Sequence, residues 1–239
     1  MNLMVSSIPV HDPAYGLWSV VLLNVALFTV FAYGFFLPRT RHDWRVFGSF
    51  AAFLVALFAE MYGFPLTIYL SSAWLGRRFP ALDPLTHESG HLWNVLIGWR
   101  GDPHLSPFHL SSAVLLAVGF VVLARAWPVL HESQRNGTIA TTGPYSRVRH
   151  PQYLAFLLIM LGFLLQWPTI PTLVLFPVLA VMYVRLARRE ERDARARFGN
   201  AYADYAAVTP AFLPRLGRDS GRRFNVPPAT PGVGDASHG

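Results

Sequence analysis

The chain lacks cysteine entirely, and its 239 residues also contain no lysine, so all 20 basic residues are arginines. Without cysteine there can be no disulfide bond, thiolate metal site or cysteine nucleophile. The absence of lysine excludes a P-loop lysine, a Schiff base and a lysine general base. Charged residues make up only 14% of the chain, against ~25% in an ordinary soluble domain, whereas hydrophobic residues make up 53%. This balance excludes a disordered chain and argues against a soluble globular enzyme.

The net charge of +7 raises the question of a nucleic-acid partner. The arginines, however, flank long apolar stretches and do not form one basic domain. We therefore expect the lipid bilayer to be the main partner, and we expect no nucleic acid.

Four long apolar stretches predict an all-α, integral membrane helical bundle with about five transmembrane helices. The stretches are residues 15–37, 46–70, 105–124 and 151–184. The first has 23 residues without a charge, or roughly 35 Å of helix, which is enough to cross a bilayer. The last has 34 uncharged residues, fewer than the ~40 that two full crossings need. We therefore expect it to form a tight hairpin of two short helices, with Pro168 and Pro171 at the turn.

The arginines also predict the orientation. Segment 185–223 holds ten of them and the loops after the first and third stretches hold more, whereas the loop 71–104 holds three and the hairpin turn none. Positive residues stay on the cytoplasmic side, so we expect the N-terminus outside and the C-terminus in the cytoplasm. No basic residue precedes Arg39, so we do not expect a cleaved signal peptide. The absence of cysteine and the arginine bias favour a bacterial inner membrane.

The densest polar motif lies where an arginine-rich loop enters the hairpin. Residues 143–153 read Gly-Pro-Tyr-Ser-Arg-Val-Arg-His-Pro-Gln-Tyr. The initial glycine and proline favour a turn, and Pro151 suits the first position of a helix. Arg149 and His150 then lie beside a helix N-terminus, whose N–H groups attract anions. The motif predicts either an anion-recognising site at the membrane surface or a loop whose arginines anchor in lipid headgroups.

A second polar cluster follows the hairpin. Residues 185–197 alternate in charge, which is typical of a solvated helix with i,i+4 pairs. Glu190 and Glu191 lie about one turn beyond the apolar stretch, where one of them can point inward. Tyr202 and Tyr205 are three residues apart and present a paired aromatic face. That face could serve packing, or could cover an adenine or a sulfonium cation.

Together the two clusters resemble the isoprenylcysteine carboxyl methyltransferase and phospholipid methyltransferase superfamily of integral membrane enzymes. The shared elements occur in the same order: Gly-Pro-Tyr at 143–145, Arg-His-Pro-x-Tyr at 149–153, a helical hairpin, Glu190-Glu191, Phe198-Gly199, Tyr-x-x-Tyr at 202–205 and a proline-containing end at 210–214. The resemblance covers residues 105–216, which we therefore expect to form a methyltransferase core. Residues 1–104 would form an N-terminal transmembrane region with an outer loop, and residues 217–239 a disordered tail.

The resemblance implies S-adenosylmethionine as the methyl donor and implies the residues that bind it. These are Gly143, Tyr145, Arg149, His150, Pro151, Tyr153, Glu190, Glu191, Tyr202 and Tyr205. Arg149, Glu190 and Glu191 are also the expected catalytic residues: the arginine could hold a carboxylate or phosphate bidentately, and a glutamate could hold the ribose hydroxyls or the amino group. His150 could be a base, or could only pack its ring. Methyl transfer mainly requires positioning and the exclusion of water, so no metal is expected.

The acceptor does not follow from these motifs. We expect a lipid-like or small amphipathic molecule that reaches the site from the bilayer. The alternative is a small thiol, methylated by an S-methyltransferase of the same superfamily. A lipid needs a lateral opening between helices, whereas a small thiol needs only a closed cavity.

A competing motif lies in the loop 71–104. His87-Glu88-Ser89-Gly90-His91 fits the H-E-x-x-H signature of zinc metalloproteases. On a helix the two histidines would share a face, with Glu88 as the base and a third ligand from Asp102, His104 or His109. A glycine inside the motif weakens a helix there. Two alternatives therefore stay open for this motif: a membrane metal-binding protein or metalloprotease, and a plain polar loop at the membrane interface.

Overall fold

The computed structural model describes residues 15–36, 38, 41–79 and 90–214, and in these ranges it contains helices and no strand. The helices are α1 (Trp18–Phe35), α2 (Arg41–Phe58), α3 (Leu66–Arg78), α4 (Leu92–Ile97), α5 (Pro107–Asn136), α6 (Pro151–Gln166), α7 (Ile170–Phe198) and α8 (Asn200–Val208). A π-helical turn, η1 (Ala59–Gly63), and two 3-10 turns, η3 (Pro103–Leu105) and η4 (Gly143–Ser146), lie between them. The expected all-α fold is confirmed.

Four helical segments are long and apolar enough to cross a bilayer: Trp18–Phe35, Asp43–Gly63, Pro107–Asn136 and Ile170–Phe198. A shorter apolar helix, Pro151–Gln166, joins them. Their outer faces carry many exposed large apolar side chains, such as Leu22 and Leu23 of α1 and Val174 and Val178 of α7. The protein is therefore an integral membrane helical bundle, and the predicted number of about five membrane helices is confirmed.

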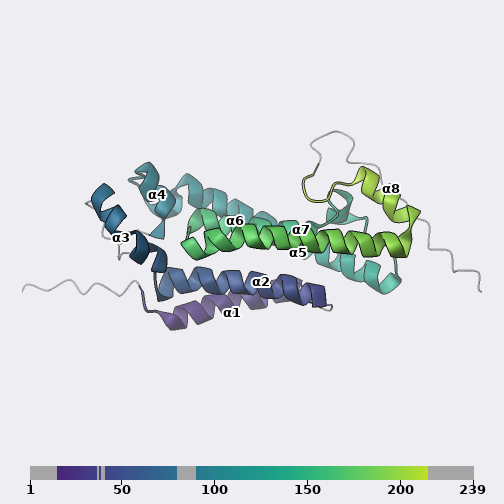
Figure 1. Cartoon of the computed structure of the whole chain (residues 1–239), viewed down its shortest axis with the longest axis horizontal. Coiled ribbons are helices and arrows are strands. Elements are labelled where there is room, and N and C mark those ends of the chain that lie inside the picture. Colours follow the sequence, from purple (N-terminus) through teal and green to yellow (C-terminus); the bar gives the residue numbers. More distant parts are fainter. Residues whose placement is uncertain (1–14, 37, 39–40, 80–89, 215–239) are drawn as a thin grey trace, which may run out of the picture.

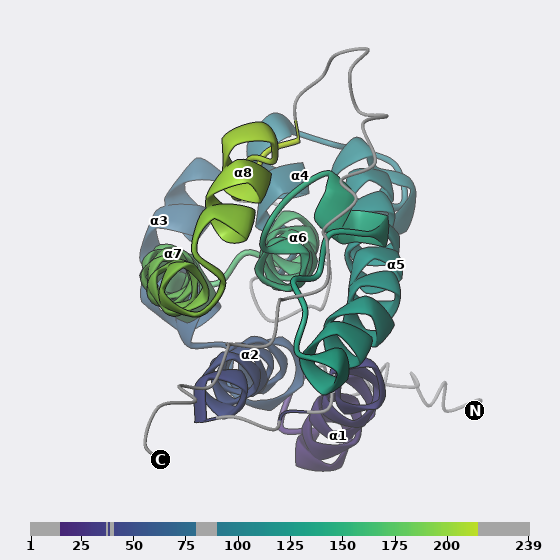
Figure 2. The same cartoon turned by 90° about the vertical axis from the view of Figure 1, so that its right-hand side faces the viewer.

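Helix α6 lies at the centre of the bundle, with α2, α5 and α7 packed around it (Figure 2). Ten of its 16 residues are buried. The ring of Phe156 lies 5.2 Å from that of Phe36 and 4.9 Å from that of Phe50, which joins α6 to the C-terminal end of α1 and to the middle of α2. This central position explains why a helix of only 16 residues is held in the bundle, and it fixes the N-terminus of α6 in place.

The close approach of α5 and α6 depends on two glycines. A Cβ atom at Gly119 would lie 2.6 Å from Cγ1 of Ile159 and 3.0 Å from the carbonyl oxygen of Ala155. A Cβ atom at Gly162 would lie 3.0 Å from Cγ of Leu116. Small residues let membrane helices pack backbone against backbone.

The predicted second span, residues 46–70, is wrong as a single helix. Helix α2 ends at Phe58, the turn η1 follows, and α3 begins only after Pro65. Pro65 lacks a backbone N–H and cannot continue the preceding helix. The buried Glu60 then accepts a hydrogen bond from the backbone N–H of Thr67 at 3.0 Å. Its carboxylate therefore satisfies one of the donors at the start of α3 that a helix leaves unpaired.

The predicted hairpin of two short helices is correct only for its first helix. The chain turns at residues 167–169, and α7 then continues for 29 residues. Thr169 caps α7 by exchanging hydrogen bonds with Thr172, so Pro171 falls in the first turn of the helix and not in the connection. The charged segment 185–197 is thus a direct continuation of the second hairpin helix, because no glycine or proline separates the apolar part from the charged part.

The bundle has two distinct ends. Helices α3 and α4 lie at one end and α8 at the other, and the long helices run between them (Figure 1). The predicted motif residues His87 and Glu88 and the predicted tail at 217–239 lie outside the described residues.

Candidate functional site

The two predicted polar clusters meet at the α8 end of the bundle. Tyr145 belongs to the turn η4, and His150 is the N-cap of α6, with Pro151 at the first helical position as predicted. The glutamates lie on α7, and Tyr202 and Tyr205 lie on α8. Segments far apart in sequence are therefore brought together at the N-terminus of the central helix.

Arg149 is held entirely by other groups of the protein. Its Nη2 and Nε lie 2.8 and 2.9 Å from Oε1 of Glu191, and its Nη1 donates to the carbonyl oxygens of Ala206 and Thr209. Its backbone N–H donates to the carbonyl oxygen of Pro210. Because the side chain is only 14% exposed, the guanidinium ties α7 and the end of α8 to the start of α6. Arg149 therefore acts as a clamp within the fold.

His150 lies inside the same network. Its Nε2 is 3.0 Å from Oε1 of Glu191, its Nδ1 is 3.6 Å from Oε2 of Glu190, and its backbone N–H donates to the carbonyl oxygen of Ala211. Burial lowers the pKa of His150, but hydrogen bonds to the two glutamates and their charges outweigh the burial, so the pKa is raised. Because the ring of His150 favours its protonated form, it is better suited to donate hydrogen bonds than to act as a base.

The tyrosines of the site are hydrogen-bond donors. Tyr153 donates to Oε1 of Glu190, Tyr145 donates to Oε1 of Gln152 at 2.8 Å, and Tyr205 donates to the carbonyl oxygen of Tyr145 at 2.7 Å. Burial, and then the charge of Glu190, raises the pKa of Tyr145 well above its ordinary value. These phenols therefore stay neutral and fix the walls of the site.

An open cleft of about 180 Å³ lies between the end of α5, the start of α6, α7 and α8. Six of the residues predicted from the sequence line it: Tyr145, Arg149, His150, Glu190, Tyr202 and Tyr205. The other four predicted residues, Gly143, Pro151, Tyr153 and Glu191, are not among its lining residues. Two of them contact lining residues: Tyr153 bonds to Glu190, and Glu191 bonds to Arg149 and His150. The cleft also has polar walls that the motifs did not indicate, including Ser133, Gln134 and Thr138.

Arg197 also lines the cleft, although the sequence pattern did not predict it. The alternating charges of residues 185–197 indicate a solvated helix and do not mark this arginine as part of a site. Glu190, Ala194 and Arg197 are spaced i, i+4, i+7 and so share one face of α7, and all three line the cleft. The guanidinium of Arg197 lies 5.1 Å from the ring centroid of Phe198. Among the described residues the Arg197 guanidinium makes no ion pair with a carboxylate, whereas the Arg149 guanidinium pairs with Glu191. The helical spacing from Glu190 is the signal that could have identified it.

The cleft thus offers an arginine that pairs with no carboxylate in the part of the chain that the structure describes, a partly exposed glutamate and aromatic rings. The Glu190 side chain is 32% exposed, so its carboxylate can reach a ligand. Such a set suits a ligand that has both an amine and a carboxylate group together with a flat ring.

Comparison with known proteins identifies similar chains. Residues 110–201 match the phospholipid methyltransferase family. The chain is 40% identical over 120 residues to the cobalt-zinc-cadmium resistance protein CzcN of Cupriavidus metallidurans. This match covers 49% of this chain and 54% of that protein. It is 37% identical over 113 residues to the nickel-cobalt-cadmium resistance protein NccN of Alcaligenes xylosoxydans xylosoxydans. This match covers 44% of this chain and 52% of that protein. The chain therefore spans about half the length of these two relatives.

A third relative is similar along most of the chain. The methanethiol S-methyltransferase 2 of Bradyrhizobium diazoefficiens is 29% identical over 221 residues, which is 88% of this chain and 79% of that protein. No solved structure matches the chain.

Proposed function

Since the chain belongs to the superfamily of integral membrane methyltransferases, we propose that it transfers a methyl group from S-adenosylmethionine to a lipid-like or amphipathic acceptor at the membrane. The observation that carries the proposal is the cleft at the α8 end, where Glu190 and Arg197 share one face of α7 below the aromatic residues of α8. The matched family region, residues 110–201, contains most of the cleft.

The lining residues fit the groups that the donor carries. Arg197 would hold the carboxylate of its amino-acid part, and Glu190 the amino group or the ribose hydroxyls. Tyr202, Tyr205 and Phe198 would face the adenine and the sulfonium cation, which is attracted to aromatic rings. The donor supplies a methyl group on a sulfonium, a reactive arrangement that needs no metal.

The remaining polar groups position this site. Arg149, Glu191 and His150 join α6, α7 and the segment after α8 through one network, so they hold the aromatic cover over the cleft. We therefore assign Arg149 and Glu191 to positioning, not to contact with the reacting groups. Precise placement and exclusion of water are what a methyl transfer most requires from an enzyme.

A lipid-like acceptor fits the location of the cleft. Helices α5 and α7 expose apolar side chains along their membrane parts, including Val118 and Val121 of α5 and Val178 and Val181 of α7. Both helices continue to the cleft, so an apolar acceptor could approach it along their lipid-facing surfaces.

A small thiol is the second candidate acceptor. The relative named methanethiol S-methyltransferase 2 aligns over 88% of this chain, so the match must include most of residues 1–104, to which no motif could be assigned. A small acceptor needs no lateral opening between helices.

An acceptor competition separates the two candidates. The full chain in nanodiscs would receive donor labelled in its methyl group, together with bacterial lipid extract or methanethiol. Label in the lipid phase supports the first proposal, and volatile labelled dimethyl sulfide supports the second. Glu190→Gln should reduce either product ~10-fold or more because it removes a charged ligand contact, whereas Glu132→Gln, outside the cleft on α5, should not. If no label leaves the donor with either acceptor, the proposed function is wrong.

Proteolysis receives no support from the geometry of His91. This residue precedes α4 with φ −77° and ψ 59°, which is not helical, whereas the H-E-x-x-H arrangement requires both histidines on one helix. The names of two relatives refer to metal resistance, and neither name refers to proteolysis.

A further inference from the structure

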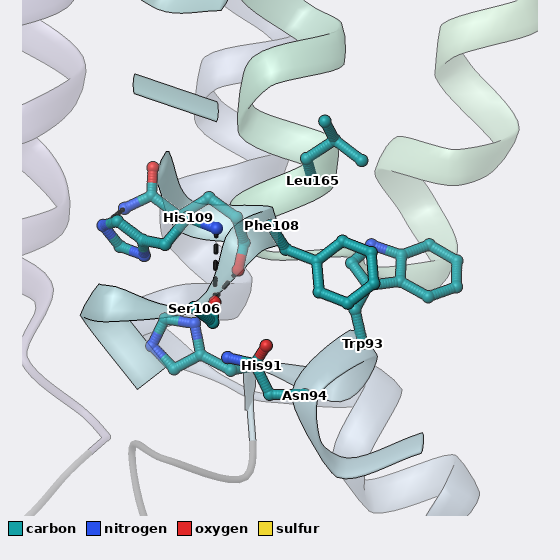
Figure 3. Close-up of a pocket in the computed structure, with 8 residues that line it drawn as sticks. His91, Trp93, Asn94, Ser106, Phe108, His109 and Leu165 are labelled. Atoms are coloured by element: carbon teal, nitrogen blue, oxygen red, sulfur yellow. Dashed lines mark hydrogen bonds between the residues drawn. The ribbon is translucent and has the colours of Figure 1, made fainter. Parts of the chain in front are cut away.

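Outside the cleft, polar side chains gather at the α4 end of the bundle and along α7. At the α4 end, His91, Asn94 and His109 line a small pocket (Figure 3) that has no room for a water molecule. His91 Nδ1 lies 3.1 Å from the carbonyl oxygen of Gln166, and no group of three histidine, aspartate or glutamate side chains in the described ranges could hold a metal ion. This cluster is therefore closed, whereas the arginines of α7 face outward.

Five arginines share one face of the charged part of α7. They are Arg185, Arg188, Arg189, Arg192 and Arg195, and all five are exposed. At ~100° of rotation per residue, they fall within an arc of roughly 120° on the helix. In the part of the chain that the structure describes, none of them makes an ion pair, so the i,i+4 pairs that the alternating charges indicate are not formed there. We call these five residues the arginine face.

The arginine face continues the lipid-facing stripe of the same helix. Val174, Val178 and Val181 are exposed apolar residues of the membrane-spanning part of α7. Arg185 and Arg188 follow them at the same alternating spacing of four and three residues. Positions with this spacing lie along one side of a helix. The side of α7 that faces the lipid tails therefore becomes basic where the charged segment begins.

The opposite side of α7 is occupied by the protein itself. Tyr183 is buried in the bundle, and Glu190 and Ala194 line the cleft. Helix α7 lies at the periphery of the bundle, with α6 at the centre (Figure 2). The arginine face therefore points away from both the core and the cleft, and a partner bound to it does not compete with a ligand in the cleft.

The length of the apolar part brings the first arginines to the depth of the lipid headgroups. Residues 170–184 carry no charge and form roughly 22 Å of helix, less than the ~30 Å of the hydrocarbon core of a bilayer. Arg185 therefore lies close to the edge of the hydrocarbon, and its long side chain can extend to the headgroups. Arg188 and Arg192 lie about 4.5 and about 10 Å further along the helix, at the level of the phosphates and of the adjoining water layer.

We propose that the arginine face binds the headgroups of anionic phospholipids in the bilayer that surrounds the chain. Guanidinium groups hold phosphate oxygens through paired hydrogen bonds, and basic side chains beside a bilayer are attracted to anionic lipids. A zwitterionic headgroup carries an ammonium group that offsets its phosphate, so it binds more weakly. The lipid tails would lie along Val174, Val178 and Val181. This surface does not depend on the proposed methyl transfer.

Native mass spectrometry of the full chain in a neutral detergent measures this binding. The delipidated protein is titrated with phosphatidylglycerol, which is anionic, or with phosphatidylcholine, which is zwitterionic. Phosphatidylglycerol should bind more tightly, and its affinity should fall as the salt concentration rises. Arg188→Gln combined with Arg192→Gln should weaken its binding on the order of 25-fold, about 5-fold for each lost charge. Arg77→Gln combined with Arg78→Gln, two exposed arginines at the end of α3, is the matched control and should bind as the unchanged chain does.

Two further variants of the experiment separate lipid binding from other causes. Arg188→Lys combined with Arg192→Lys keeps both charges and should retain most of the affinity. Glycerophosphoglycerol, the soluble headgroup without lipid tails, should not compete at the same concentration. Because the substituted side chains are exposed, the lipid-free glutamine variant should melt close to the unchanged chain. Equal phosphatidylglycerol affinity of the glutamine variant and the unchanged chain would overturn the proposal, as would equal affinity of the unchanged chain for the two lipids or competition by the soluble headgroup.

Discussion

At the scale of single residues, Arg149 and Arg197 show that a motif does not by itself separate an arginine paired within the fold from one whose guanidinium is available in the cleft. Arg149 belongs to the Arg-His-Pro-x-Tyr motif, and the sequence predicts that it binds the donor, yet its guanidinium is already paired with Glu191 and two carbonyl oxygens. Arg197 belongs to no motif and lines the cleft, and within the described ranges its guanidinium pairs with no carboxylate. The groups that pair with Arg149 lie 42 or more residues away in the sequence, so the local motif cannot show that its guanidinium is already occupied.

The clamp role of Arg149 predicts a stability defect. Arg149→Gln removes charge-assisted hydrogen bonds and should lower the free energy of unfolding by about 1.5–3 kcal/mol. Arg195→Gln, on the exposed face of α7, should change it by less than ~0.5 kcal/mol. Thermal unfolding in detergent measures both. Equal melting temperatures for the two variants would contradict the clamp.

His150 predicts a pH dependence of stability. Its pKa is raised in the folded protein, because Glu190 and Glu191 outweigh the effect of burial. A raised pKa means that the folded state binds the proton more tightly, so the stabilisation is full below the unfolded pKa of about 6.5 and is lost as the pH rises through the folded value. The melting temperature of the unchanged chain should therefore exceed that of His150→Gln most at pH 6, and the difference should shrink towards pH 9. A difference that grows with pH would contradict this sign.

At the scale of elements, apolar length and proline position predicted the helices well, and the errors have identifiable causes. Apolar length does not show where a helix is interrupted, so the break formed by η1 and Pro65 was missed. A charged segment gave no reason to extend the hairpin, so the continuity of α7 through to Phe198 was missed as well. The central position of α6 also depends on contacts with α2, α5 and α7, which no local pattern reports.

The packing of α5 on α6 predicts a strong effect at Gly119. Gly119→Ala places a Cβ atom 2.6 Å from Cγ1 of Ile159 and should destabilise the protein by about 1–3 kcal/mol through overpacking. The better helix propensity of alanine offsets up to ~1 kcal/mol of this loss. Gly34→Ala, in α1, is the matched control, because a Cβ atom there meets nothing within 4 Å. Its melting temperature should stay equal or rise. If Gly119→Ala behaves like Gly34→Ala in the same melting experiment, the close approach of the two helices is wrong.

At the scale of the whole molecule, the membrane bundle followed from composition, whereas sidedness is a prediction from the arginine distribution. The absence of cysteine allows a clean test with single introduced cysteines. Glu132→Cys lies at the cleft end and should resist an impermeant thiol reagent in intact cells, whereas Arg100→Cys lies at the α4 end and should react. The opposite pattern of labelling would reverse the orientation.

Much of the cleft lining was predictable from the sequence because the motifs named residues in η4, at the start of α6, on α7 and on α8, but the architecture and the α5 wall were not. Six of the ten expected donor-binding residues line the cleft, and Tyr153 and Glu191 bond to residues that line it. Ser133 and Gln134 come from the end of α5, which extends 12 residues beyond its predicted limit at residue 124, and Thr138 follows directly after that helix. Apolar length predicts only the part of a helix that lies in the bilayer.

Donor binding is the most direct test of the central claim that this cleft holds S-adenosylmethionine. The full chain in nanodiscs would be titrated by calorimetry with S-adenosylhomocysteine and with 5′-methylthioadenosine, which lacks the amino-acid part. The unchanged chain should bind S-adenosylhomocysteine saturably. Arg197→Gln should weaken that binding roughly 10- to 150-fold through the loss of a charge-assisted contact, and should leave methylthioadenosine binding unchanged. Absence of saturable S-adenosylhomocysteine binding by the folded, unchanged chain would contradict the account.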